Sequence, residues 1–114
     1  MRAEALPKAA RIRRRKEFLA AQKDGVRTHS AHFVVIRQLA PGVSSRLGVT
    51  VSSRVGNAVA RNRTKRVVRE IFRRRQRILV PPTDFVVIAK PGADRLKYVQ
   101  VAKELDRALR PAGG

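Results

Sequence analysis

Residues 46–70 read RLGVTVSSRVGNAVARNRTKRVVRE, and this stretch decides the fold. In Arg46–Ser52 every second residue is apolar, which predicts a strand with one buried face. Asn57 is a residue type that caps helices, and the segment after it has a helical apolar period of about 100° per residue. The stretch therefore predicts a strand followed by a helix with one apolar face and one basic face.

The predicted helix runs from Asn57 to about Leu79, where Pro81-Pro82 ends it. Its apolar arc consists of Thr64, Val67, Val68, Ile71 and Phe72. A second arc consists of Asn62, Lys65, Arg66, Arg69 and Arg73. Residues 61–77 hold nine basic side chains and one acid, whereas an ordinary solvated face mixes both signs. This helix is therefore expected to bind phosphate groups.

Further elements extend outward from this unit on both sides. We predict a helix over Arg15–Lys23, strands over Val26–His29, His32–Leu39 and Asp84–Lys90, and a last helix over Tyr98–Arg110. The connection through Pro41-Gly42 is short, so we predict that the strands on either side of it form an antiparallel hairpin. The order αβββαβα predicts an α+β protein, a single-domain α/β sandwich in which helices cover a small central sheet.

The length of the chain limits the number of domains, and its net charge limits the kind of partner that it can bind. The 114 residues suit one domain: a basic, flexible N-terminus over residues 1–10, a single RNA-binding domain over 11–110 and a disordered tail over 111–114. Twenty-seven Lys and Arg against 8 Asp and Glu give a net charge of +19, which repels itself unless a polyanion neutralises it. Most of these cations are arginines, whose planar guanidinium suits phosphates. The expected partner is nucleic acid.

Other classes are disfavoured. The chain has no cysteine, which excludes disulfides and thiolate zinc sites, and its apolar runs are too short for a membrane span. We expect a cytoplasmic protein without a membrane partner. The eight acids are scattered, and His29 and His32 are interpreted as strand-end or surface residues, so no catalytic residue and no metal ligand is assigned.

The motif on the basic helix resembles that of a known family. Residues 56–69 match the pattern Gly-Asn-Ala-Val-x-Arg-Asn-Arg-x-Lys-Arg-x-x-Arg, which closely resembles the signature of the bacterial ribonuclease P protein subunit. The similarity extends to Lys16-Glu17-Phe18, to residues 32–35 and to residues 84–89. It covers about residues 7–110, nearly the whole chain.

The resemblance implies a protein cofactor of a ribozyme that removes the 5′ leader of precursor tRNA by endonucleolytic cleavage. The RNA would carry out bond cleavage, with Mg²⁺ held mainly by RNA and no cofactor bound by the protein alone. The partners would be ribonuclease P RNA and precursor tRNA, and we expect a monomer in a 1:1 complex with the RNA. The resemblance also implies that the basic helix lies in a left-handed crossover between parallel strands, against the general preference for right-handed connections.

The resemblance implies two sets of site residues. Those facing the catalytic RNA are Asn57, Arg61, Asn62, Arg63, Lys65, Arg66, Arg69 and Arg73. Those in a leader-binding cleft between the first helix and the sheet are Arg11, Arg13, Arg14, Phe18, Phe33, Ile36, Thr50 and Arg54. The family often lines this cleft with aromatic rings, but two such positions fall on Gln22 and Ile36 here, so the arginines and Thr50 should contribute more. Phe33 lies in an apolar run and could equally belong to the core.

Two alternatives remain. A structural ribosomal protein, or another RNA-binding protein without a role in cleavage, would explain the charge and the sandwich equally well but not the Arg-Asn-Arg signature. A DNA-binding protein is disfavoured because no helix-turn-helix spacing is evident. Restoration of leader cleavage by a ribonuclease P RNA separates the first alternative from the leading interpretation.

Overall fold

The computed structural model describes residues 6–75 and 81–109, and every predicted helix and strand lies at its expected place. The elements are η1 (Lys8–Ala10), α1 (Arg15–Asp24), β1 (Val26–His29), β2 (Phe33–Leu39), β3 (Arg46–Val51), α2 (Ala58–Arg75), β4 (Thr83–Ala89), η3 (Ala93–Arg95) and α3 (Tyr98–Leu109). The predicted helix ends at Leu79 and Arg110 lie outside the described residues, as does the tail over 111–114. Leu6 and Ala10, before the predicted domain boundary at residue 11, are buried in the core.

The sheet has four strands in the order β1-β2-β4-β3, and one predicted pairing is wrong. Strand β2 pairs antiparallel with both β1 and β4, and β3 lies parallel to β4, so β2 and β3 do not form a hairpin. The hairpin joins β1 to β2, with the N–H of Ser30 donating to the carbonyl of Phe33 at 2.8 Å. Strand β4 is apolar on both faces and takes an inner position, whereas the alternating β3 lies at an edge.

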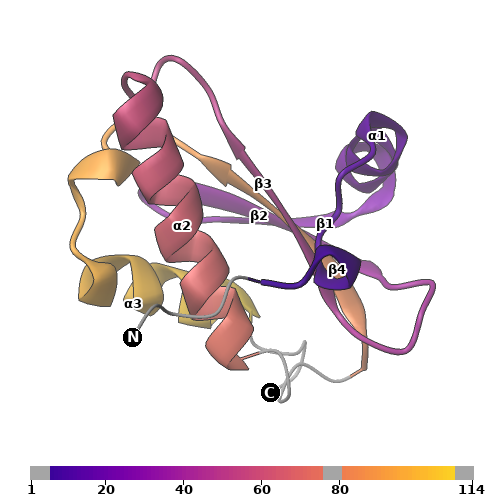
Figure 1. The fold of residues 1–114 in the computed structure, drawn as a ribbon. Coiled ribbons are helices and arrows are strands. Elements are labelled where there is room, and N and C mark those ends of the chain that lie inside the picture. The colour runs from indigo at the N-terminus through magenta and orange to yellow at the C-terminus, as the bar shows by residue number, and fades with distance from the viewer. Residues whose placement is uncertain (1–5, 76–80, 110–114) are drawn as a thin grey trace.

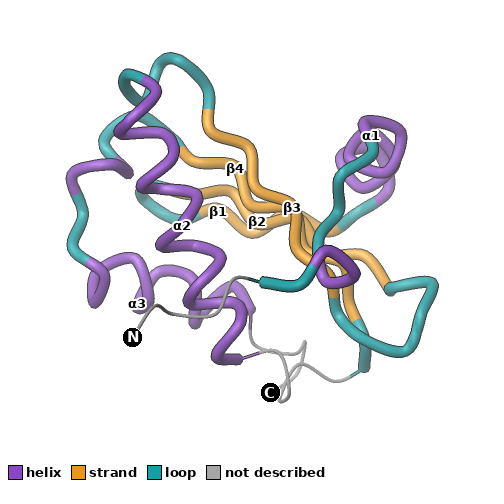
Figure 2. Tube along the Cα trace, viewed as in Figure 1, coloured by secondary structure: helices purple, strands orange, loops and turns teal. Residues whose placement is uncertain are grey.

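Helices cover both faces of this sheet. Helices α2 and α3 lie on one face and α1 on the other (Figure 1), and the path of the chain between these layers is clear in Figure 2. The larger core cluster joins the sheet to α2 and α3, and a smaller one joins it to α1. The α/β sandwich is therefore confirmed. The connection from β3 through α2 to β4 joins parallel neighbours, and its left-handedness stays a prediction of the resemblance.

Helix α2 is oriented as its periodicity predicts. Thr64, Val68, Ile71 and Phe72 are buried, and the Phe72 ring meets Phe85 of β4 edge-on, with centroids 6.0 Å apart. At the start of the helix, the side-chain oxygen of Asn57 accepts the N–H of Ala60 at 2.9 Å, as a capping residue does. With the apolar arc against the sheet, the arginine-rich arc faces away from the core.

Candidate nucleic-acid interface

The predicted RNA-contacting residues of α2 lie off its buried arc. Asn57, Asn62, Arg63 and Arg66 are exposed. The other four are half-buried: Arg61, Lys65, Arg69 and Arg73. We call these eight residues the basic face of α2. The sequence therefore identified which side of the helix is available to a partner.

Two arginines of this face have a hydrogen-bond partner within the protein, and only one of these partners is a carboxylate. Arg63 Nη1 donates to the carbonyl of Asp94 at 2.7 Å. Glu70 pairs with Arg73 at 2.7 Å and with Arg74 at 3.0 Å, and hydrogen bonds from these two guanidinium groups hold the pKa of Glu70 below its usual range. Arg73 therefore already has a carboxylate partner and is the least available arginine of the face.

Five other residues of the basic face have no side-chain partner among residues 6–75 and 81–109. Within the described residues, no side-chain hydrogen bond or ion pair is made by Arg61, Asn62, Lys65, Arg66 or Arg69. The Nε of Arg61 is buried and also lacks a hydrogen-bond acceptor there. Hydrogen-bond donors left unsatisfied in this way favour an external acceptor. A row of phosphate oxygens has the required charge and geometry.

Arg11 joins this face from the N-terminal segment. Burial lowers the pKa of Arg69, and the nearby charge of Arg11 lowers it further, so two cations lie close together. The backbone of Arg11 forms an isolated parallel β-bridge with Leu47 of β3. Its side chain donates from Nε to the carbonyl of Leu6 at 2.8 Å. Its neighbour Ile12 packs in the cluster under α1, so Arg11 points to the other side of the sheet. Arg11, predicted for the leader cleft, is thus grouped with the basic face of α2.

A partly uncovered strip of sheet lies beside α1. It consists of four cross-strand neighbours, one from each strand: His29, Val34, Ile88 and Thr50. We call these residues the open strip. His29 and Thr50 are exposed and Ile88 is half-buried, whereas Val34 is buried and belongs, with Ile88 packed against it, to the apolar cluster under α1. The strip therefore has exposed polar ends at His29 and Thr50, and Ile88 is the partly exposed apolar residue between them.

Several predicted leader-binding residues border the open strip. Thr50 belongs to it, and Arg54 follows β3 on the exposed surface. Phe18 on α1 is half-buried, with its ring over Gly48 of β3. Arg13 and Arg14 are exposed in the segment that leads into α1. Thr50, Arg54, Arg13 and Arg14 are thus exposed and Phe18 is partly exposed, and their contact with a leader stays a prediction.

Phe33 and Ile36 are corrections to the predicted leader-binding set. Both side chains are 0% exposed. Phe33 points to the opposite face of the sheet and packs in the larger cluster with α2 and α3. Ile36 faces α1 but is covered, and a Cβ added at Gly25 would lie 2.4 Å from it. Because both faces of β2 are covered along this apolar run, neither residue can contact RNA.

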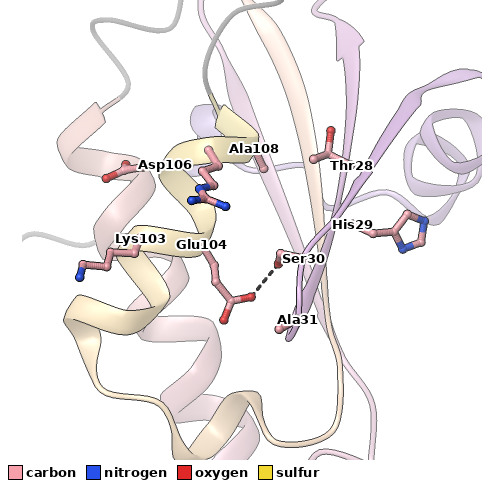
Figure 3. Close-up of a pocket in the computed structure, with 9 residues that line it drawn as sticks. Thr28, His29, Ser30, Ala31, Lys103, Glu104, Asp106 and Ala108 are labelled. Atoms are coloured by element: carbon pink, nitrogen blue, oxygen red, sulfur yellow. Dashed lines mark hydrogen bonds between the residues drawn. The ribbon is translucent and has the colours of Figure 1, made fainter.

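A separate pocket of about 720 Å³ lies at the β1 edge of the sheet, against α3 (Figure 3). Its lining consists of Thr28, His29, Ser30, Ala31, Lys103, Glu104, Asp106, Arg107 and Ala108. Glu104 points toward Ser30 and accepts its hydroxyl at 2.7 Å, and it pairs with His32 Nδ1 at 2.7 Å. Burial raises the pKa of Glu104, but the hydrogen bonds from Ser30 and His32 outweigh it and the net shift is downward. This network holds α3 to the β1–β2 hairpin.

The described carboxylates are not grouped as a metal site would require. In residues 6–75 and 81–109, no three His, Cys, Asp or Glu side chains are grouped so that they could hold a metal ion. Asp106 pairs with Arg75, and Asp84 pairs with Arg46, so these acids are already neutralised. In the same residues, no helix is long and apolar enough to span a membrane.

A mixed sheet between helices, with a basic helix on which Arg61, Lys65, Arg66 and Arg69 have no carboxylate partner among the described residues, defines a small α+β protein with a surface suited to a polyanion. The ribonuclease P family model matches residues 6–113. The chain belongs to the ribonuclease P protein family.

Relatives and solved structures agree with this assignment. The ribonuclease P protein component of Geobacter sp. (strain M21) is 42% identical over 103 residues, covering 90% of this chain and 88% of the relative. That of Desulfovibrio desulfuricans is 44% identical, covering 96% and 88%. The RNase P protein from Thermotoga maritima superposes with a TM-score of 0.79 at 35% identity, covering 87% of this chain and 94% of that one. The protein from Staphylococcus aureus gives a TM-score of 0.79 at 33% identity, covering 90% and 94%.

The open strip shows what sequence reasoning missed. Val34, Ile88 and His29 were not predicted as site residues, although they form most of the strip. Each lies in a segment whose strand character was predicted. Their common row depends on the strand order and register, which the sequence does not state. Alternation alone could have placed Ile88 on the same face as Val86, but not beside Thr50.

Proposed function

We propose that this chain is the protein subunit of a ribonuclease P ribonucleoprotein, in which it promotes removal of the 5′ leader from precursor tRNA. The basic face of α2 binds the ribonuclease P RNA. The open strip and the side chains around it bind the single-stranded leader. The RNA carries out bond cleavage and holds most of the Mg²⁺, while the protein supplies binding and charge neutralisation.

The observation that carries this proposal is the uncompensated charge of the basic face. Arg61, Lys65, Arg66 and Arg69 lack a carboxylate partner in the described residues, in a chain with a net charge of +19. Cations held close together without counter-ions favour a ligand with closely spaced phosphates. The signature on this helix is the part of the chain that most closely resembles the family motif, which makes ribonuclease P RNA the expected ligand.

The open strip supports binding of an unpaired strand. Phe18 offers a half-buried ring at its border, and unpaired bases stack on such rings without strong sequence preference. Arg54, Arg13 and Arg14 are exposed and can reach phosphates, contacts that position an RNA without reading its sequence. A protein with both features should bind precursor tRNA more tightly than mature tRNA, which lacks the leader.

Binding measurements with the assembled ribonucleoprotein test this proposal. Dissociation constants for precursor and mature tRNA are compared with and without the protein, at several salt concentrations. The protein should strengthen precursor binding more than mature tRNA binding. Equal strengthening of both would refute the leader contact. Binding to any structured RNA with the same affinity would favour a general RNA-binding or ribosomal role.

A further inference from the structure

Helix α1 is held on the sheet by apolar packing, by a hydrogen bond from Arg27 to the carbonyl of Gln22, and by an ion pair. Ala21 is buried, and the Phe18 ring lies over Gly48, where an added Cβ would be 2.7 Å from its Cζ. Next to Phe18, Glu17 Oε2 lies 2.8 Å from Nη2 of Arg46 on β3. The residue that precedes the leader-facing ring therefore ties α1 to the edge strand.

Arg46 is a fixed partner for Glu17 because the sheet already holds it. Its Nε lies 2.9 Å from Oδ1 of Asp84, and its Nη2 lies 2.6 Å from Oδ2. Asp84 is the cross-strand neighbour of Arg46 on β4 and is only 8% exposed. A bidentate pair of this kind fixes the plane of the guanidinium group. Glu17 therefore pairs with a guanidinium group whose position and orientation are already fixed by Asp84.

The place of this ion pair determines which part of the sheet α1 covers. Arg46, Gly48 and Thr50 point to the same face of β3, since they alternate with the residues that face α2. The ion pair holds α1 at the Arg46 end, and the Phe18 ring lies over the next position at Gly48. Thr50, one step further, remains exposed as part of the open strip.

We propose that Glu17 is a positioning residue for leader binding, which acts through Arg46 to hold α1 and the Phe18 ring at the border of the open strip. This inference rests on the proposed function of the strip. The leader contacts Phe18 and the strip, and Glu17 does not touch it. Loss of the ion pair lets α1 shift over the sheet, so that the ring no longer lies where an unpaired base can stack on it.

Two charge reversals on α1 separate positioning from simple electrostatics. Glu17→Lys and Asp24→Lys each raise the net charge by the same amount on the same helix. Asp24 is exposed at the end of α1, and within the described residues its side chain makes no hydrogen bond or ion pair. Non-specific attraction to RNA should rise equally in both variants, whereas only Glu17→Lys places two cations against each other at Arg46.

The readout is the ratio of mature to precursor tRNA dissociation constants in the reconstituted ribonucleoprotein, measured beside the melting temperature of each variant. Glu17→Lys should lower this ratio by at least about fivefold, the lower end of what one base-stacking contact contributes. Asp24→Lys should leave the ratio unchanged, and affinity for the ribonuclease P RNA should not fall in either. Glu17→Gln, which keeps an oxygen that can accept from Arg46, should retain most of the selectivity.

The outcomes distinguish a positioning role of Glu17 from a structural role, and both from failure of the proposed function. A folded Glu17→Lys protein with the selectivity of Asp24→Lys would refute the positioning role and leave the proposed function intact. If Glu17→Lys does not fold, Glu17→Gln decides: a lowered melting temperature with a parallel loss of affinity for the ribonuclease P RNA would mean that Glu17 is mainly structural. A wild-type protein without selectivity for precursor tRNA would refute the proposed function, and this inference with it.

Discussion

Gly48→Ala is a direct perturbation of the contact between α1 and the sheet. The added Cβ would lie 2.7 Å from Cζ and 2.8 Å from Cε1 of Phe18, and 3.2 Å from Cβ of Ile12. Carbon atoms in good contact are about 3.5–4.0 Å apart, so the Phe18 ring must move outward by about 1 Å. The substitution therefore displaces the ring that we propose to stack on the leader, while it removes no side chain.

The expected cost can be worked out from these distances. An extra methyl group in a well-packed site costs about 1–3 kcal/mol, and replacing glycine stabilises by about 0.4–1 kcal/mol through the unfolded state. The net loss is about 1 kcal/mol, which lowers the melting temperature by about 4 °C. Selectivity for precursor over mature tRNA should fall as well, because the ring has left its place beside the open strip.

Gly42→Ala is the matched control. No heavy atom lies within 4 Å of the position of its added Cβ, and its φ is not in the left-handed region. It should leave selectivity unchanged and raise stability by about 0.4–1 kcal/mol. Melting curves and tRNA binding constants are measured for both variants. A Gly48→Ala protein that matches Gly42→Ala in both would refute the packing of Phe18 on β3.

Four further results are expected. Lys65→Ala and Arg66→Ala should each reduce by about one the slope of log K for ribonuclease P RNA against log salt, without lowering the melting temperature; an unchanged slope would place them away from RNA. Ile71→Asp should unfold the domain, because a buried unpaired charge costs several kcal/mol, and a normal melting curve would mean that α2 is rotated. Phe18→Ala should cost about 1–3 kcal/mol of precursor binding and spare mature tRNA binding; equal losses would indicate a structural role only. The pKa of Glu104 is lowered in the folded protein, so its stabilisation is complete above about pH 4.5 and is lost as the pH falls through the folded pKa. Calorimetry should therefore show a shallower acid dependence for Glu104→Gln, and parallel curves would contradict this.

Local patterns in the sequence predicted the elements but not all of their neighbours. The capping residue Asn57 and the helical period of the apolar arc fixed both the start of α2 and the side that it buries. The pairing of β2 with β3 was wrong because closeness in sequence favours a hairpin, whereas burial decides otherwise. The strand Thr83–Ala89 is covered on both faces and therefore lies between them.

For a similar reason, the sequence predicted the helical part of the candidate site better than the part that lies on the sheet. A helix shows its free side through its period, so the basic face of α2 could be assigned from the sequence. Phe33 and Ile36 lie in a run of four apolar residues, which does not reveal that helices cover both faces of the strand. The open strip combines residues from all four strands, and its recognition required the register. The pairing of Glu17 with Arg46 was equally beyond reach, since it joins segments that the sequence separates.

The most direct measurement is cleavage of a precursor tRNA by a ribonuclease P RNA at a low Mg²⁺ concentration, with and without this protein. The account predicts that RNA and protein together remove the 5′ leader under conditions in which the RNA alone does not. The reason is that a net charge of +19 offsets the repulsion between the RNA and its substrate. The protein alone should not cleave. Absence of stimulation by a folded protein, or cleavage by RNA-free protein, would contradict the account.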